Sequence, residues 1–324
     1  MKAALLVAPG RIAVGEFPDP ELGPDDVRIA VGGVGLCGSD ASVFSGRWST
    51  PTLPWIMGHE ACGTIEAVGQ RVSGARIGEA VVVEPNVVCF ECDQCLQGRT
   101  SACLRRQSVG MNRQGALAER LVVPSRFAWP VERVAPVDLV CVEPLTVVEA
   151  ALRRLGAPPP DPVLVIGCGP QGLLMCHALL RRGIGMEVHD INAGRVAFAA
   201  ELGARPLDTE ATERRFHLVV DTVGAPSSVE MALSRLEIGG TLLVLGLDGT
   251  PFELTAQRLV RRQLVLRGSL TYDHPDDFQR TVAAVRAGGL LPGRIVTDEY
   301  SLDDAQLAFE RGADTRGKTW IRVR

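Results

Sequence analysis

The feature that most constrains the fold is an alternation of short strands and helices between residues 163 and 246. Apolar, partly β-branched runs predict the strands, and longer segments with helical spacing separate them. Strands that alternate with helices in this way are typical of a parallel, doubly wound sheet. The predicted strands are 163–167, 186–190, 217–224 and 241–246, and the predicted helices are 173–183, 193–204 and 227–236.

The sequence before this region has a different character. Residues 26–31, 62–69 and 80–85 are β-branched runs bounded by Gly, Pro and Asp, as expected for strands. The four prolines of GAPPPDP, residues 156–162, interrupt any regular element. We therefore predict an α/β protein in which a β-rich domain precedes the doubly wound domain. These patterns leave the segment after about residue 268 unassigned.

A glycine-rich fingerprint, GCGPQG, follows the predicted strand 163–167 and opens the next helix. Its first glycine allows a tight turn, the second lets the backbone approach a pyrophosphate, and the third permits close helix–strand packing. The helix N-terminus supplies N–H groups and partial positive charge to the phosphates. The predicted dinucleotide-binding residues of this turn are Gly167, Gly169, Pro170, Gln171 and Gly172.

Asp190 ends the second strand of this region. A carboxylate at that point can accept hydrogen bonds from both ribose hydroxyls and would repel a 2′-phosphate. NAD is therefore favoured over NADP. Arg195 follows five residues later and, lying beside the adenosine, would weaken that preference; its alternative interpretation is a surface partner of Asp190.

Four of the nine cysteines lie in one short segment, residues 89–103, which we call the four-cysteine loop. The spacing of Cys89, Cys92, Cys95 and Cys103 suits one tetrahedral zinc. Disulfides are disfavoured because the cysteine count is odd and the apolar N-terminal stretch is too short for a signal peptide. We expect a cytoplasmic protein with reduced thiols. Four thiolates leave no open coordination position, so this zinc is interpreted as structural.

Candidate ligands of a second, catalytic zinc come from three separate stretches, GLCGSD, GHE and VEPL. A catalytic zinc needs about three protein ligands and one exchangeable position. A thiolate, an imidazole and one carboxylate would leave the metal close to neutral and able to accept an alcohol oxygen. The candidates are Cys37, His59, Glu60 and Glu143, with Ser39 and Asp40 beside them.

These motifs together resemble the zinc-dependent medium-chain alcohol and polyol dehydrogenases over nearly the whole chain. The likeness includes CGSD, GHEACGTIEAVG, the four-cysteine loop, VLVIGCGPQG and a terminal KTWI. It implies a GroES-like catalytic domain made of residues 1–145 and 271–324, with its structural zinc loop at 89–103. It also implies a Rossmann dinucleotide-binding domain at residues 146–270, with the nucleotide between the domains.

The resemblance further implies two Zn²⁺ per chain and a homodimer or homotetramer. Cys37, His59 and either Glu60 or Glu143 would hold the catalytic zinc. Asp40 would accept a hydrogen bond from the His59 ring and fix its tautomer. Ser39 would hydrogen-bond the substrate hydroxyl and relay its proton.

A carboxylate at position 143 instead of a cysteine favours the sorbitol-like branch and a substrate bound through more than one oxygen. The expected reaction is hydride transfer between NAD and a secondary alcohol of a polyol, sugar or cyclitol. The alternatives are a threonine-type or simple alcohol dehydrogenase and, less favoured, an inactive nucleotide-binding zinc protein. A formal charge of −4 argues against nucleic acid or an anionic membrane as partner.

Two residues depart from the family pattern. Ser42 occupies a position where many members have a proton-relaying histidine, and Gln171 stands where an aliphatic residue is usual. The proton must then leave by way of Ser42, water or the ribose. Phe44, Trp48 and Trp55 fall between the CGSD and GHE stretches, and two interpretations are open for them: they line the substrate pocket or they belong to ordinary core packing. The remaining histidines are interpreted as structural or surface residues: His177, His189, His217 and His274.

Overall fold

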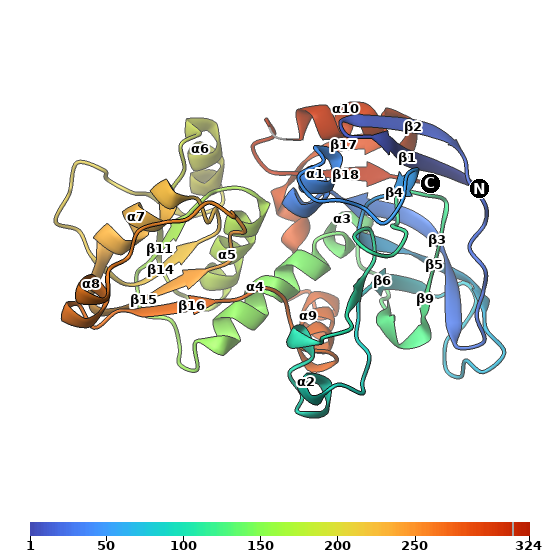
Figure 1. The fold of residues 1–324 in the computed structure, drawn as a ribbon, viewed down its shortest axis with the longest axis horizontal. Helices are drawn as coiled ribbons and strands as arrows, with labels where there is room; N and C mark the ends of the chain where they lie inside the picture. The colour runs from blue at the N-terminus through green and yellow to red at the C-terminus, as the bar shows by residue number, and fades with distance from the viewer. Residues whose placement is uncertain (313) are drawn as a thin grey trace. The chain divides into compact units, whose positions relative to one another are not determined.

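A computed structural model describes residues 1–312 and 314–324. The chain divides into two compact units (Figure 1). Unit 1 comprises Met1–Glu143 and Asp273–Arg324, and unit 2 comprises Pro144–Tyr272. No helix in the described part of the chain has both the length and the apolar composition needed to span a bilayer.

Unit 2 is built on one parallel sheet of six strands in the order β13-β12-β11-β14-β15-β16. Helices α5 and α7 pack on these strands, and helices flank the sheet (Figure 1). The sheet strands are β11 (Val163–Ile166), β12 (Met186–His189), β13 (Arg205–Pro206), β14 (Phe216–Asp221), β15 (Leu236–Val244) and β16 (Val265–Gly268). The helices are α5 (Pro170–Arg181), α6 (Ala193–Glu201), α7 (Pro226–Arg235) and α8 (Ala256–Arg261).

This strand order reverses between β11 and β14, and such reversal points are where doubly wound sheets bind ligands. The predicted doubly wound fold is thus confirmed. Helix α5 begins at Pro170, three residues before the predicted start, because proline suits the first position of a helix. Strand β15 likewise begins at Leu236, earlier than predicted.

Unit 1 is β-rich and holds a seven-stranded sheet in the order β10-β6-β5-β3-β18-β17, with β9 paired to β3. A second sheet has the order β2-β1-β4, and β7 pairs with β8 beside the four-cysteine loop. Its strands are β1 (Lys2–Ala8), β2 (Arg11–Glu16), β3 (Asp26–Gly35), β4 (Trp55–Ile56), β5 (Glu60–Val68), β6 (Ala80–Val83), β7 (Asn86–Val87), β8 (Gln107–Ser108), β9 (Arg120–Pro124), β10 (Ala128–Pro130), β17 (Val296–Ser301) and β18 (Lys318–Arg322).

The helices of unit 1 are short, and α4 continues from unit 1 into unit 2. The α-helices are α1 (Gly38–Phe44), α2 (Asp93–Leu96), α3 (Pro136–Leu139), α4 (Val142–Arg154), α9 (Asp276–Arg286) and α10 (Ala305–Arg311). The 3-10 helices are η1 (Thr100–Ala102), η2 (Ser125–Phe127), η3 (Pro292–Ile295) and η4 (Leu302–Asp304).

The C-terminal segment, which the sequence patterns left unassigned, completes the large sheet of unit 1. Strand β18 pairs antiparallel with β3, placing Trp320 opposite Gly35, and parallel with β17. Buried side chains from both ends of the chain, including Ile29, Val31 and Ile321, form one core. The last strand therefore lies inside the large sheet of unit 1, between β3 and β17.

Candidate active site

Strand pairing brings the first predicted ligands together. Gly35 at the end of β3 pairs with Glu60 at the start of β5, so the residues just outside both strands are neighbours. His59 occupies the position just before β5, and Cys37 lies two residues beyond the end of β3. A sulfur, an imidazole nitrogen and a carboxylate oxygen from Cys37, His59 and Glu60 lie within 4.8 Å of one another. This donor set suits a zinc ion.

The buried carboxylate of Asp40 positions Cys37 and His59 through hydrogen bonds. It is fully buried, and its Oδ1 lies 3.2 Å from Nδ1 of His59 while also accepting the Gly58 N–H. Its Oδ2 accepts the Cys37 N–H at 3.0 Å, at the start of α1. Burial alone would lower the pKa of His59, but the Asp40 carboxylate outweighs it and holds that pKa well above the ordinary value. With Nδ1 turned to Asp40, Nε2 is the nitrogen available to a metal.

Glu60 is also engaged in a buried ion pair with Lys318. Both side chains are only 1% exposed, and the Lys318 ammonium additionally donates to the Leu36 carbonyl at 3.0 Å. The Lys318 ammonium lies against Glu60 Oε2, so the two buried charges compensate each other. A Cβ at Gly35 would collide with Glu60 and Lys318, which explains the glycine.

The sulfurs of the four-cysteine loop converge within 4.8 Å. Cys89 and Cys95 are 3.9 Å apart, and Cys103 and Cys89 are 3.5 Å apart. Four sulfurs at about 2.3 Å from a tetrahedral zinc would stand roughly 3.8 Å from each other. The loop therefore fits a zinc ion. Hydrogen bonds from the backbone, led by Glu91, lower the pKa of Cys89 to about 6, which favours the thiolate that a metal requires.

In unit 2 the fingerprint lies at the carboxyl end of β11. Gly167 has a φ of 94°, which favours glycine, and a Cβ at Gly172 would collide with the Gly167 carbonyl. Asp190 Oδ2 accepts the Cys168 N–H at 2.7 Å. Burial raises the pKa of Cys168 to about 12, Asp190 adds to that rise, and Arg195 opposes it. Asp190 and Arg195 thus both lie at the glycine-rich turn.

Comparison with known proteins identifies the family to which the chain belongs. Residues 23–133 match the alcohol dehydrogenase GroES-like domain, and residues 170–287 match the zinc-binding dehydrogenase domain. Both parts of one architecture are present in the expected order. The chain belongs to the zinc-binding medium-chain dehydrogenases/reductases. It is therefore an oxidoreductase of the zinc-dependent alcohol dehydrogenase type.

Three relatives illustrate the breadth of this family. The L-threonine 3-dehydrogenase of Shewanella frigidimarina is 29% identical over 318 residues, covering 91% of each chain. The structure of galactitol-1-phosphate dehydrogenase from Escherichia coli superposes with a TM-score of 0.91 at 26% identity, covering 100% of both chains. A putative zinc-binding dehydrogenase from Sinorhizobium meliloti, bound to NADP, gives a TM-score of 0.91 at 26% identity and covers 99% of each chain.

The aromatic residues between the CGSD and GHE stretches of this medium-chain dehydrogenase differ in their surroundings. Trp55 is buried and donates from Nε1 to the Gly110 carbonyl at 2.9 Å, and the Phe44 ring packs 5.0 Å from that of Phe309. Of the two interpretations, core packing fits both residues: Trp55 belongs to the core of unit 1, and the partly buried Phe44 packs against it. Trp48 is exposed.

The two departures from the family pattern have local structural explanations. The Ser42 hydroxyl is buried and donates to the Gly38 carbonyl, one turn earlier in α1. The Ser42 hydroxyl proton is therefore already used in a hydrogen bond within α1. Ser39, in the first turn of α1, is partly exposed. Gln171 donates from Nε2 to the Pro144 carbonyl at 3.4 Å, linking the fingerprint helix α5 to the start of α4.

Glu143 lies buried in the first turn of α4. Within the described residues, the metal-binding group around His59 contains Glu60 and not Glu143. Sequence reasoning missed Lys318, although KTWI was one of the motifs that carried the resemblance. A lysine at the start of an apolar strand signals a buried charge that needs a partner.

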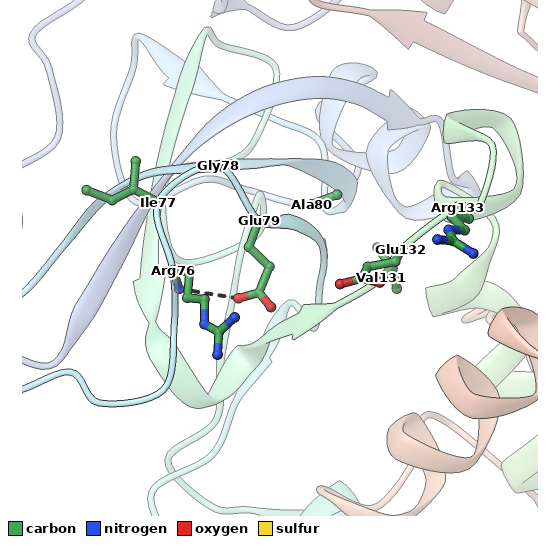
Figure 2. Close-up of a pocket in the computed structure, with 8 residues that line it drawn as sticks. All are labelled: Arg76, Ile77, Gly78, Glu79, Ala80, Val131, Glu132 and Arg133. Atoms are coloured by element: carbon green, nitrogen blue, oxygen red, sulfur yellow. Dashed lines mark hydrogen bonds between the residues drawn. The ribbon is translucent and has the colours of Figure 1, made fainter.

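The cavity in Figure 2 is separate from this constellation. It has a volume of about 490 Å³ and lies where β5 has ended and β6 begins, at the opposite end of β5 from Glu60. Charged side chains of both signs line it, and it includes no predicted site residue. The lining residues are Arg76, Ile77, Gly78, Glu79, Ala80, Val131, Glu132 and Arg133.

The buried Glu60–Lys318 pair gives a stability prediction. Lys318→Met should destabilise the protein by roughly 3–5 kcal/mol, because it leaves the Glu60 charge buried without its partner. Urea unfolding measures the change. Lys2→Met, which removes the exposed Lys2–Asp303 pair, is the control and should cost less than about 1 kcal/mol. Equal losses in the two variants would contradict a stabilising role for the buried pair.

Proposed function

We propose that this protein is an NAD-dependent dehydrogenase that oxidises a secondary alcohol of a polyol, sugar or cyclitol. The observation that carries the proposal is the cluster of Cys37, His59 and Glu60, oriented by Asp40. The glycine-rich turn with Asp190 supplies the second half of the reaction, a place for the dinucleotide.

The proposed catalytic zinc is held by Cys37, His59 and either Glu60 or Glu143. When bound, zinc supplies Lewis-acid activation of the substrate hydroxyl. Asp40 keeps the His59 ring in one tautomer and orientation. Ser39, partly exposed in the first turn of α1, is the proposed first acceptor of the hydroxyl proton. Because the Ser42 hydroxyl is occupied, we propose that the proton continues through water or the cofactor ribose.

The two candidates for the third ligand have different support. Glu60 shares the cluster with Cys37 and His59, but the ammonium of Lys318 already compensates its charge. Glu143 is buried at the start of α4 and is the alternative ligand that the family resemblance implies. A carboxylate ligand from either position suits a substrate that binds through more than one oxygen.

A threonine-type activity is the second candidate function, favoured by the 29% identity to an L-threonine 3-dehydrogenase. The polyol proposal is supported by the likeness to galactitol-1-phosphate dehydrogenase. A substrate panel separates them: polyols, their phosphates, cyclitols, L-threonine and simple secondary alcohols, each with NAD and with NADP. We expect the highest kcat/KM with a polyol-type substrate, and loss of turnover after chelation.

The panel also contains the outcomes that reject the proposal. A clear preference for L-threonine would replace the polyol assignment. Turnover that persists after complete metal removal would reject the metal mechanism. Tight NAD binding without turnover of any compound would favour an inactive nucleotide-binding zinc protein.

The proposed NAD preference rests on Asp190. Asp190→Gly should weaken NAD binding by roughly tenfold or more, because hydrogen bonds to a charged group are lost. NADP binding should weaken less, so discrimination should relax. Asp190→Asn is the matched control: it can still accept the Cys168 N–H and thus preserve the turn while removing the charge. Dissociation constants for both cofactors test this, and unchanged NAD affinity in Asp190→Gly would contradict it.

We propose that the enzyme is a homodimer, or a homotetramer built from such dimers, in which two subunits join through β16, one edge of the unit 2 sheet. Val265 and Leu266 on this strand are exposed, and an exposed apolar edge favours pairing with another strand. Leu266→Lys should therefore shift the mass in solution from dimer to monomer, as measured by light scattering. Ile77→Lys, at the exposed Ile77 of unit 1, should not change it. A dimer that survives Leu266→Lys would reject this interface.

We also propose a cytoplasmic location. All nine cysteines are free thiols in the structure, including five that are buried or half-buried outside the four-cysteine loop. Reduced thiols suit a reducing compartment. Localisation of the tagged full chain by fractionation tests the proposal.

A further inference from the structure

The chain returns from unit 2 to unit 1 at Asp273, and the first residues after this point contact the four-cysteine loop. We call residues 273–277 the return segment. The Thr100 hydroxyl, in η1 of the loop, accepts the His274 N–H at 2.6 Å and lies 3.3 Å from the His274 carbonyl. The neighbouring Ser101 N–H donates to Asp273 Oδ1 at 2.9 Å. Thr100 is buried, so water competes little for these bonds.

The His274 side chain is held from outside the loop as well. Its Nδ1 lies 2.9 Å from Oε2 of Glu84, a fully buried carboxylate that also accepts the Trp129 N–H at 2.7 Å. The Phe127 ring lies 4.7 Å from the imidazole. Glu84 follows β6 and Phe127 precedes β10, so the ring is fixed to the body of unit 1.

A residue of the four-cysteine loop also contacts the His274 ring directly. Phe90, next to the metal-ligand candidate Cys89, meets the imidazole edge-on with ring centroids 5.4 Å apart. The loop thus contacts the return segment at two separated points, Phe90 and η1. Both points lie between Cys89 and Cys103, so an ion that binds these cysteines fixes both points relative to each other.

Inside the return segment, the Asp273 N–H donates to Asp277 Oδ2 at 2.9 Å, at the start of α9. Asp277 is buried and pairs with Arg280. A displacement of Asp273 would therefore disturb the first turn of α9.

We propose that the four-cysteine loop, once closed by its metal, anchors the return segment through Thr100 and Ser101, so that metal binding and the ordering of residues 273–277 stabilise each other. This role goes beyond bracing the loop itself. It depends on the proposed structural metal and not on the identity of the substrate or on the catalytic zinc.

Thr100→Val tests the proposal, because valine preserves the size of the side chain and removes the hydroxyl. In full-length protein, hydrogen exchange measured by mass spectrometry should accelerate at residues 273–277 by roughly five- to tenfold. Thr100→Ser retains the hydroxyl and should behave as wild type. Gln94→Ala removes the Arg99–Gln94 hydrogen bond within the same loop and should leave the return segment unchanged.

The reciprocal effect is measured on the metal. Coupling between two sites must act equally in both directions. The affinity for zinc, measured by equilibrium competition with a chelator, should therefore also weaken in Thr100→Val by a comparable factor. The measurement is made in the Cys37→Ser background, where one ion per chain is expected. Zinc stoichiometry determined first shows whether that background is as proposed.

Three outcomes would overturn the inference. Unchanged hydrogen exchange at residues 273–277 in Thr100→Val would show that Thr100 does not anchor the return segment. Faster exchange with unchanged zinc affinity would show that metal binding and the segment are not coupled. Equal acceleration in Gln94→Ala would show that any loop change has this effect. If Thr100→Val fails to fold, Asp273→Ala with Asp273→Asn as control tests the Ser101 contact from the other side, with the same two measurements.

Discussion

Cys37→Ser should reduce turnover by roughly 10³-fold or more while the fold and one zinc per chain remain. Zinc contributes several kcal/mol of charge stabilisation in such reactions, and each 1.36 kcal/mol corresponds to about tenfold in rate. Cys37 is partly exposed at the start of α1, where its sulfur belongs to the His59–Glu60 cluster and not to the core. Replacing the sulfur by oxygen should therefore weaken metal binding with little effect on packing.

The measurements are NAD reduction, elemental analysis and thermal unfolding of the same preparation. We expect a fall from two zinc ions to one and a melting temperature close to that of wild type. An active Cys37→Ser enzyme, or one that retains both ions, would show that Cys37 does not hold the catalytic metal.

Cys95→Ser should instead cause a large loss of stability, whereas Cys37→Ser should leave stability nearly unchanged. The thiols of the four-cysteine loop surround a common centre, and its small core consists of Val88, Cys103 and Phe127. With so little apolar burial, the loop depends on its metal, and structural zinc contributes folding free energy directly. We expect insolubility or a melting temperature lower by on the order of 10 °C.

Cys37→Ser is the natural control for Cys95→Ser, since both replace a sulfur by an oxygen in unit 1. Cys95→Ser protein that remains soluble should retain the zinc at the His59 cluster. If it melts like wild type and loses only activity, the catalytic and structural assignments are reversed.

The local parts of the candidate site are those whose geometry the sequence alone restricts. The four cysteines lie within one short loop and the fingerprint within six residues, so spacing alone limits their geometry. Within residues 163–246, most strands and helices followed from the hydrophobic pattern, because they are regular and bounded by turn residues. Strands β13 and β16 and helix α8 were not predicted. The segment after about residue 268 was left unassigned, and its last strand acquires a role only when β18 pairs with β3.

Aromatic residues show the other limit of sequence reasoning. Phe44 and Trp55 stand between two active-site motifs, yet their side chains point into the core of unit 1. Proximity along the chain does not determine which face of a strand or helix a residue occupies. Ser42 is a further example, because only the structure shows that its hydroxyl donates a hydrogen bond to the Gly38 carbonyl.

The sequence by itself thus determined the kinds of ligand, the two candidate metal centres, the dinucleotide turn and the family. Tertiary structure decided which remote groups are in contact. It brings Asp40 to His59, Lys318 to Glu60, and the return segment to the four-cysteine loop. The physical reason is the distance along the chain. Short loops restrict their own geometry through the covalent backbone, whereas contacts between remote segments arise only from strand register and burial, which the whole chain sets together.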